Sequence, residues 1–199
     1  MDNAMKTASH TFRLLIAATL ALATVPIAKA LDFKATRSFR MLEGVKIPLL
    51  LFPDGTREIR YEPPDRWEIA GEGATISFRP KGLAMAELKL ILSPKAPARA
   101  GERAGQVPAP GEVLNAHLPP DATKVEPVSE AENPFMLETV GSHEAVLAFT
   151  SGGQRYRISI ATCDLNPTQW LAVVTTAFER DFEEVRRAAI GSMFSWQAL

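Results

Sequence analysis

Alternating apolar and polar residues predict several β-strands in the second half of the chain. In the run QRYRISIATC, residues 154–163, the apolar side chains face one way, and the polar ones, Arg155 and Arg157 among them, face the other. The runs HEAVLAFT (143–150) and TQWLAVVTTAF (168–178) predict two neighbouring strands. The last run is apolar on both faces, which predicts a central strand that is covered on both sides.

The preceding region predicts an antiparallel hairpin and three further strands. An apolar run, Lys46 to Phe52, meets the turn residues Pro-Asp-Gly and then a mixed segment, Arg57 to Glu62, so we expect two paired strands. The double proline that follows must end the second strand, because proline has no N–H for a strand ladder. Further strands are expected near Trp67, over ATISFRP (74–80) and over AELKLILSP (86–94).

Two helices are predicted, one long and one short. The segment from Phe178 to Trp196 is amphipathic, with apolar residues three or four positions apart, at Phe182, Val185, Ala189, Met193 and Trp196. A short helix is expected within EVLNAHL (112–118), where Pro119 and Pro120 end it. The proline- and glycine-rich stretch 94–111 is expected to be a loop that is mobile or that becomes ordered on a partner.

The N-terminal 30 residues have the three parts of a secretory signal peptide. A basic lead precedes LLIAATLALATV (14–25), an apolar run without a charge, and small residues follow at Ala28 and Ala30. The run is too short to span a bilayer, which needs about 20 apolar residues. We therefore expect cleavage before Leu31 and an exported protein, periplasmic or extracellular, with no stable membrane span after cleavage. Residues 31–199 suit one domain.

Charge and cysteine content narrow the classes of partner. Removal of the N-terminal segment leaves 19 basic and 22 acidic side chains, a net charge of −3. The sequence contains no basic stripe, so we do not expect it to bind nucleic acid or an anionic membrane.

Cys163 is the only cysteine, so the chain cannot form an intramolecular disulfide. We expect Cys163 to be a small buried side chain, and the alternatives are a reactive thiol or a disulfide with a partner protein.

The sequence assigns no catalytic residue, no metal ligand and no cofactor. Only His117 and His143 follow the predicted cleavage site, and neither stands in a motif for nucleophilic catalysis or metal binding. Glu144 follows His143, but neighbours on a strand point to opposite faces. The acidic residues are numerous but fall mostly in turns and on the solvent face of the last helix, so a hydrolase built from carboxylates is the least favoured alternative.

Three residues are candidates for binding. Trp67 lies in YEPPDRWEI, which forms either a cup for a ligand or, as we prefer, a corner where two prolines turn the chain and the indole closes the core. Arg155 and Arg157 share one strand face. They can bind an anion or a partner, but pairing with acidic residues on a neighbouring strand or helix is the preferred interpretation.

The order of elements resembles PsbP-like domains, a superfamily that includes the Ran-release factor Mog. A strand leading through Y-x-P-P-x-x-W into the next strand is similar to the opening of these domains. The strand QWLAVVTTAF followed by the helix DFEEVRRAAIGSMFSW is similar to their close. The resemblance implies an α+β fold, an αβα sandwich with a mainly antiparallel sheet, and it implies non-enzymatic accessory roles. The segment LEGVKIPLLLF (42–52) and the proline-rich loop from Pro94 have no match in the family.

These observations favour an exported, non-catalytic accessory protein that contacts another protein of the cell envelope. The loop 94–111 is the first candidate for the contact, and the face of Arg155 and Arg157 is the second. The alternative is a carrier of a small ligand or metal, with a pocket near Trp67 or His143.

Overall fold

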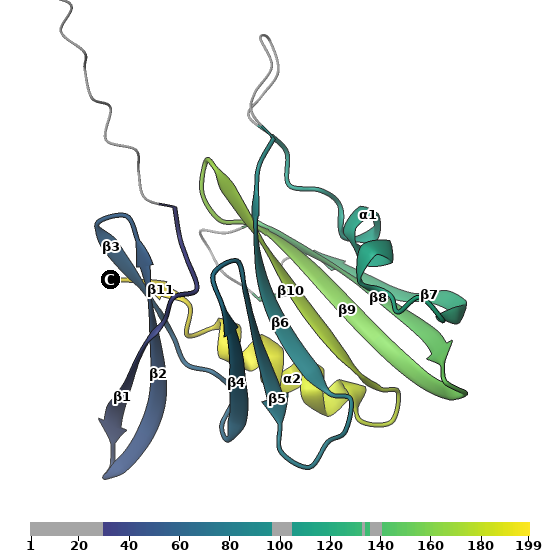
Figure 1. Cartoon of the computed structure of the whole chain (residues 1–199), viewed down its shortest axis with the longest axis horizontal. Coiled ribbons are helices and arrows are strands. Elements are labelled where there is room, and N and C mark those ends of the chain that lie inside the picture. The colour runs from purple at the N-terminus through teal and green to yellow at the C-terminus, as the bar shows by residue number, and fades with distance from the viewer. Residues whose placement is uncertain (1–29, 97–104, 133, 136–140) are drawn as a thin grey trace, which may run out of the picture.

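The computed structural model describes residues 30–96, 105–132, 134–135 and 141–199. Within these ranges the chain is mostly β-structure, arranged in two antiparallel sheets with two short helices (Figure 1). The smaller sheet has the strand order β1-β2-β3-β11, and the larger has the order β4-β5-β6-β10-β9-β8-β7.

The smaller sheet is built mainly from one continuous segment. Its strands are β1 (Thr36–Leu42), β2 (Val45–Asp54), β3 (Arg57–Tyr61) and the two-residue β11 (Gln197–Ala198). The predicted hairpin over 46–62 is confirmed as β2 and β3. Strand β1 was not predicted. It pairs with β2 through a tight turn at Glu43 and Gly44, both of which have positive φ, as the two-residue turns of hairpins require.

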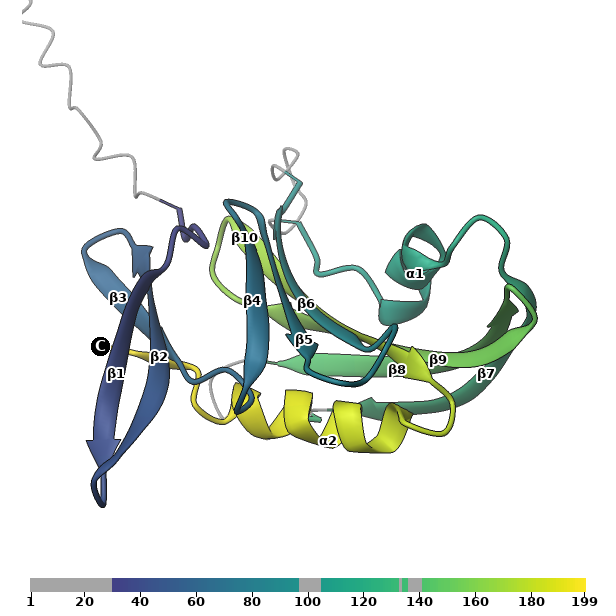
Figure 2. The same ribbon diagram turned by 60° about the horizontal axis from the view of Figure 1, so that its bottom comes forward.

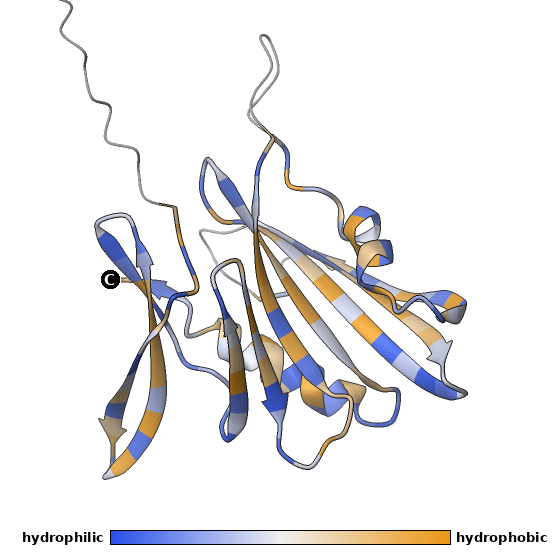
Figure 3. Cartoon of the chain, viewed as in Figure 1, coloured by the Kyte–Doolittle hydropathy of each residue, from blue (hydrophilic) through white to orange (hydrophobic). Residues whose placement is uncertain are grey.

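The larger sheet contains the strands that the alternating pattern predicts. These are β4 (Trp67–Glu72), β5 (Thr75–Pro80), β6 (Glu87–Pro94), β8 (Ser142–Ser151), β9 (Gln154–Asp164) and β10 (Gln169–Phe178). Strand β10 is the middle strand of the seven, and its predicted central position is confirmed. The edge strand β7 (Thr123–Glu132) was not predicted, and all ten of its residues are exposed. Figure 3 shows the alternation of hydrophilic and hydrophobic residues along β9.

The helices cover the two faces of this sheet unequally. Helix α2 (Phe182–Met193) lies along one face, as predicted, although it is shorter than the segment from 178 to 196 (Figure 2). The predicted short helix is confirmed as α1 (Pro110–Leu114), which continues into a 3₁₀ turn, η1 (Asn115–His117). It covers only part of the opposite face (Figure 2).

The predicted αβα sandwich is wrong. One face is covered by the single helix α2, of 12 residues, and the opposite face has only the five residues of α1 and the three of η1. The prolines at 119 and 120 end this short helical segment, and the proline-rich stretch before it does not favour a helix. Residues 42–52, for which the resemblance gave no match, form the end of β1, its turn and most of β2 in the second sheet, and not a covering helix.

The main hydrophobic core lies between the smaller sheet, the larger sheet and α2. Its aromatic centre joins Phe52 and Tyr61 from the smaller sheet to Trp196, with ring centroids 5.9–6.3 Å apart. Phe78 of β5 lies 5.5 Å from Tyr61. A second cluster lies on the other face of the larger sheet, below α1, and joins Leu114 to residues of β8, β9 and β10. The two clusters therefore hold α2 and the smaller sheet on one face of the larger sheet, and α1 on the other face.

Candidate functional surfaces

The segment YEPPDRWEI is the connection between the two sheets. Tyr61 ends β3 inside the core, Pro63 and Pro64 are buried, and β4 begins at Trp67. Asp65 and Arg66 project into solvent, as expected for a corner. Trp67 is half-buried. It packs against the core and also lines a shallow hollow of about 490 Å³ beside the C-terminal end of α2. The corner interpretation is therefore confirmed, and binding at Trp67 stays a prediction.

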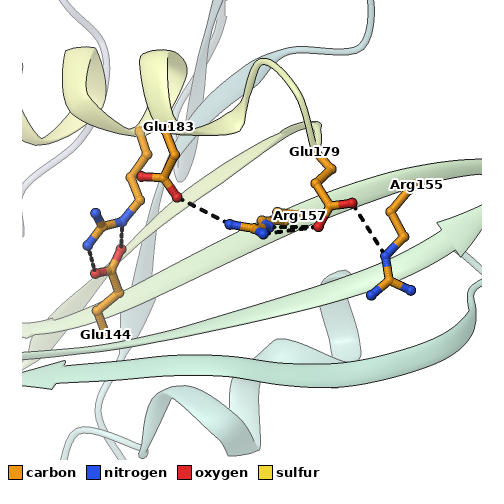
Figure 4. A network of polar contacts seen from close by, with 6 residues as sticks. Glu144, Arg155, Arg157, Glu179 and Glu183 are labelled. Atoms are coloured by element: carbon orange, nitrogen blue, oxygen red, sulfur yellow. Dashed lines mark hydrogen bonds and ion pairs between the residues drawn. The ribbon is translucent and has the colours of Figure 1, made fainter.

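Arg155 and Arg157 are both engaged by acidic side chains (Figure 4). Arg155 pairs with Glu126 of β7 at 2.7 Å and with Glu179 at 3.6 Å. Arg157 contacts the same Glu179 at 3.0 Å and Glu183 of α2 at 3.3 Å. Pairing with acids on neighbouring elements, the preferred interpretation, is confirmed. An incoming anion would have to compete with Glu179 at both guanidinium groups.

A buried ion pair extends this row of charges along α2. Glu144 of β8 is buried, and both of its carboxylate oxygens accept hydrogen bonds from Arg186 (Figure 4). The hydrogen bonds and the negative charge of Glu144 raise the pKa of Arg186. His143 points to the other face and is exposed, as the strand periodicity predicts. The pair therefore ties α2 to the sheet, and His143 takes no part in it.

The predicted cleavage region lies partly outside the described residues. Residues 1–29, including Ala28, are not described; Ala30 is exposed. Leu31 is buried, and its main chain makes two hydrogen bonds with the side-chain amide of Gln169, at 2.9 and 3.0 Å. The first residue of the expected mature chain is thus part of the core. The loop 94–111 is described only at its ends, because residues 97–104 lie outside the described ranges.

The outer half of the β1–β2 hairpin carries a group of exposed large apolar side chains. Strand β3 pairs with β2 only from Leu50 onwards, so residues 45–49 and their partners on β1 form a two-stranded ribbon that projects from the molecule (Figure 1). Four large apolar side chains on this ribbon are 48–63% exposed: Phe39, Met41, Leu42 and Val45. Sequence reasoning missed this surface, although the glycine at the turn was a signal for a hairpin.

One face of the ribbon combines apolar and basic groups. The register places Phe39 opposite Pro48 and Met41 opposite Lys46, on the same face as the buried Leu50. The Lys46 ammonium lies 4.6 Å from the centre of the Phe39 ring, a cation–π contact. Arg37 also lies on this face and is exposed. We name Arg37, Phe39, Met41, Lys46 and Pro48 the hairpin face.

Two larger hollows lie on the larger sheet. One, of about 950 Å³, is lined by residues 106–112 and by β7 and β8 next to His143, with several exposed glutamates. The other, of about 700 Å³, lies between the loop that joins β5 to β6 and the 3₁₀ turn η1. His117 lines the second hollow. Sequence reasoning passed over this residue because it stands alone, between Ala116 and Leu118.

In the described part of the chain, no three or more His, Cys, Asp or Glu side chains are grouped so that they can hold a metal ion. Cys163 is buried, and burial raises the pKa of its thiol to about 12. The helices described include none with the length and apolar character needed to cross a membrane.

Comparison with known proteins finds distant similarity. No protein-family model matches the chain, and no curated protein sequence matches it. The solution structure of PsbP (CyanoP) from Synechocystis sp. PCC 6803 is 13% identical, with a TM-score of 0.46 over 88% of this chain and 96% of that one. LpqN, involved in cell envelope biogenesis of Mycobacterium tuberculosis, is 13% identical, with a TM-score of 0.42 over 83% and 89%. The first is a PsbP protein, from the family that the sequence resembles. Both similarities are too distant to carry a conclusion about function.

Proposed function

We propose that this protein is an exported, non-catalytic accessory protein that binds a segment of another protein of the cell envelope at its β1–β2 hairpin. The observation that carries the proposal is the exposure of Phe39, Met41, Leu42 and Val45 together on one projecting ribbon. Single exposed apolar residues are ordinary, but several on one element are typical of an interaction site.

The free edge of β1 favours an extended partner segment. Strand β1 pairs with β2 on one side only, so alternate residues direct their N–H and C=O groups outwards, where another strand can pair with them. The edge strand β7 differs, because Pro127, two register shifts and three glutamates oppose such pairing. Strand β1 contains no proline and its pairing has no bulge. The edge of β1 is therefore more favourable than the edge of β7 for pairing with a partner strand.

Charge selects the partner's composition. Arg37 and Lys46 lie on the hairpin face, while the chain as a whole is acidic after removal of the N-terminal segment. A second copy would bring a hairpin face of the same positive charge alongside this one, which opposes pairing of two hairpins. A segment with alternating apolar and acidic residues fits better, because the apolar residues meet Phe39 and Met41 and the acidic residues meet the cations.

The test is photocrosslinking in cells that export the protein. A photoreactive amino acid is placed at Met41, and for comparison at Val128 of β7, which is 44% exposed. We expect one protein to be crosslinked at position 41 and not at 128, through an extended segment identified by mass spectrometry. A peptide with that sequence should bind the purified protein, protect the β1 amides from hydrogen exchange and bind more weakly at high salt.

The double variant F39S/M41S removes the two large apolar side chains of the hairpin face and tests whether they bind the partner. It should reduce the crosslink and the peptide affinity at least tenfold with little change in stability, since both side chains are more than half exposed. Crosslinking to lipid or to a second copy contradicts the proposal, and so does a partner that F39S/M41S retains fully. N-terminal sequencing of the exported protein tests the export step, with Leu31 expected as the first residue.

A further inference from the structure

The hollow between the β5–β6 loop and η1 has the form of a small-molecule site. It occupies about 700 Å³ on the face of the larger sheet opposite α2, and its lining residues come from five separate parts of the chain. Binding sites for small ligands commonly have about 300–1,000 Å³, an apolar lining and a few converging polar groups. This hollow has each of these features, and it is separate from the β1–β2 hairpin.

The floor of the hollow is aromatic and rigid. Phe149 and Tyr156 stack with ring centroids 5.3 Å apart, and Phe178 stacks on the other side of Tyr156 at 4.8 Å. Tyr156 is only 8% exposed, and its hydroxyl makes no hydrogen bond to another residue in the described ranges. Because Tyr156 lines the hollow, its hydroxyl is available to a ligand there.

The wall from β6 supplies charge. Glu87 is paired with Lys89 at 2.7 Å and with Arg79 at 2.8 Å. Burial of the Glu87 carboxyl disfavours its charged form, but the hydrogen bonds and charges of Lys89 and Arg79 outweigh burial and lower its pKa. One carboxylate thus faces two cations, and one positive charge is left over. At the rim, Lys81 and Glu68 are 4.0 Å apart. Their opposite charges cancel, so the net charge of the lining residues stays at one positive charge.

The opposite wall supplies a neutral polar group and the rim an apolar one. Burial, and then the positive charge of Lys89, lower the pKa of His117, so its imidazole is uncharged at neutral pH. Met85 stands at the rim, 64% exposed and at a positive φ of 64°, and Leu83 lies beside it on the same loop. Methionine adapts readily to apolar groups of different shape. The rim therefore suits an apolar body, and the surplus cation suits an acid group.

From this arrangement we infer that the hollow binds an amphipathic organic acid, with its carboxylate at Lys89 and Arg79 and its apolar body against Met85, Leu83 and the Phe149–Tyr156 floor. The Tyr156 hydroxyl is placed to donate a hydrogen bond to the acid. Glu87 holds the two cations in position before the ligand arrives, and their surplus charge selects an anion over a neutral or cationic molecule of the same shape.

The test is titration calorimetry of the whole exported protein with decanoate, with decanol and decyltrimethylammonium as probes of equal chain length and different charge. Decanoate should bind with one site per chain, and each of the other probes at least tenfold more weakly. Absence of binding by decanoate, or equal affinity for all three probes, overturns the inference.

Two variants locate the site. K89M removes the surplus charge and should weaken decanoate binding at least tenfold, while Y156F should weaken it severalfold without loss of the ring stack. R187M is the matched control, because Arg187 is an exposed cation on α2, on the other face of the sheet. It should bind as the unaltered protein does. Equal affinity in K89M, Y156F and R187M places the ligand elsewhere and contradicts the inference.

Discussion

The hydroxyl of Tyr61 lies 2.8 Å from the Oγ atom of Ser192, and this contact joins the smaller sheet to the helix that covers the larger one. Ser192 donates its own hydrogen to the carbonyl oxygen of Ala189, so Tyr61 is the donor to Ser192. One turn further on, Ser195 Oγ accepts a hydrogen bond from the backbone N–H of Glu62. The last turn of α2 and the residues just after it thus hold Tyr61, the last residue of β3, and Glu62, which follows it.

The two members of this contact should differ in the cost of their removal. Y61F loses one hydrogen bond but leaves Ser192 bonded to Ala189, so we expect a loss of about 1 kcal/mol in the free energy of unfolding. S192A leaves the fully buried Tyr61 hydroxyl without its acceptor and should cost about 1–3 kcal/mol. Urea unfolding of both variants measures the difference. Y156F is the control, expected within about 0.5 kcal/mol of the unaltered protein. A larger cost for Y61F than for S192A would contradict this order of donors.

Glu62 should make the free energy of unfolding depend on pH in the acidic range. Its carboxylate accepts hydrogen bonds from Arg40 at 2.9 Å and from Arg60 at 2.8 Å. Burial disfavours the charge, but these two arginines outweigh burial and lower the pKa of Glu62. Because the folded pKa is below the unfolded value, the stabilisation is present above about pH 4.3 and is lost as the pH falls through the folded pKa.

The variant E62Q tests this dependence by urea unfolding at a series of pH values. At pH 7 it should be less stable than the unaltered protein by about 1 kcal/mol. The difference should shrink as the pH falls below about 4. E68Q is the control, because Glu68 is exposed and its ion pair with Lys81 is 4.0 Å long. A gap between E62Q and the unaltered protein that is the same at pH 3 and pH 7 would exclude this role for Glu62.

The strands that the sequence predicted are those with a buried face. In β9, Tyr156, Ile158 and Ile160 alternate with polar residues because one side of the strand packs below α1. Strand β1 is exposed on both faces over most of its length, so burial imposes no alternation on TRSFRML. Strand β7 lacks the pattern for the same reason. A strand whose residues are not selected for burial on one face leaves no two-residue period in the sequence.

The corner was predictable and the hollow was not. Two prolines before Trp67 restrict the chain locally, so their effect can be inferred from neighbouring residues alone. The hollow brings His117, Met85 and Phe149 together from segments about 30 residues apart. No local pattern marks these residues, and a histidine between two apolar residues carries no distinct signal. The pairing of Arg155 and Arg157 with acids was predictable in kind, because cations on a partly covered strand face need partners, but not in identity.

Cys163 should be unreactive in the folded protein. The thiol is buried, and burial raises its pKa to about 12, so very little reactive thiolate is present at pH 8. We expect Ellman's reagent to modify less than a tenth of the chains in an hour without denaturant, and all of them in concentrated urea. Rapid modification of the folded protein would favour the alternative of a reactive thiol or a disulfide with a partner.

Loss of Arg186 should be among the most harmful single changes outside the aromatic core. R186M leaves the carboxylate of Glu144, whose side chain is 3% exposed, without its bidentate partner. Removing one member of a buried ion pair commonly costs about 3–5 kcal/mol. R187M removes an exposed cation from the next position of the helix and should change stability by less than about 0.5 kcal/mol. The double variant E144L/R186M should regain most of the loss, because neither charge then remains buried. Thermal unfolding of the three variants decides the matter: if the double variant is as unstable as R186M, the pair contributes through packing and not through its charge.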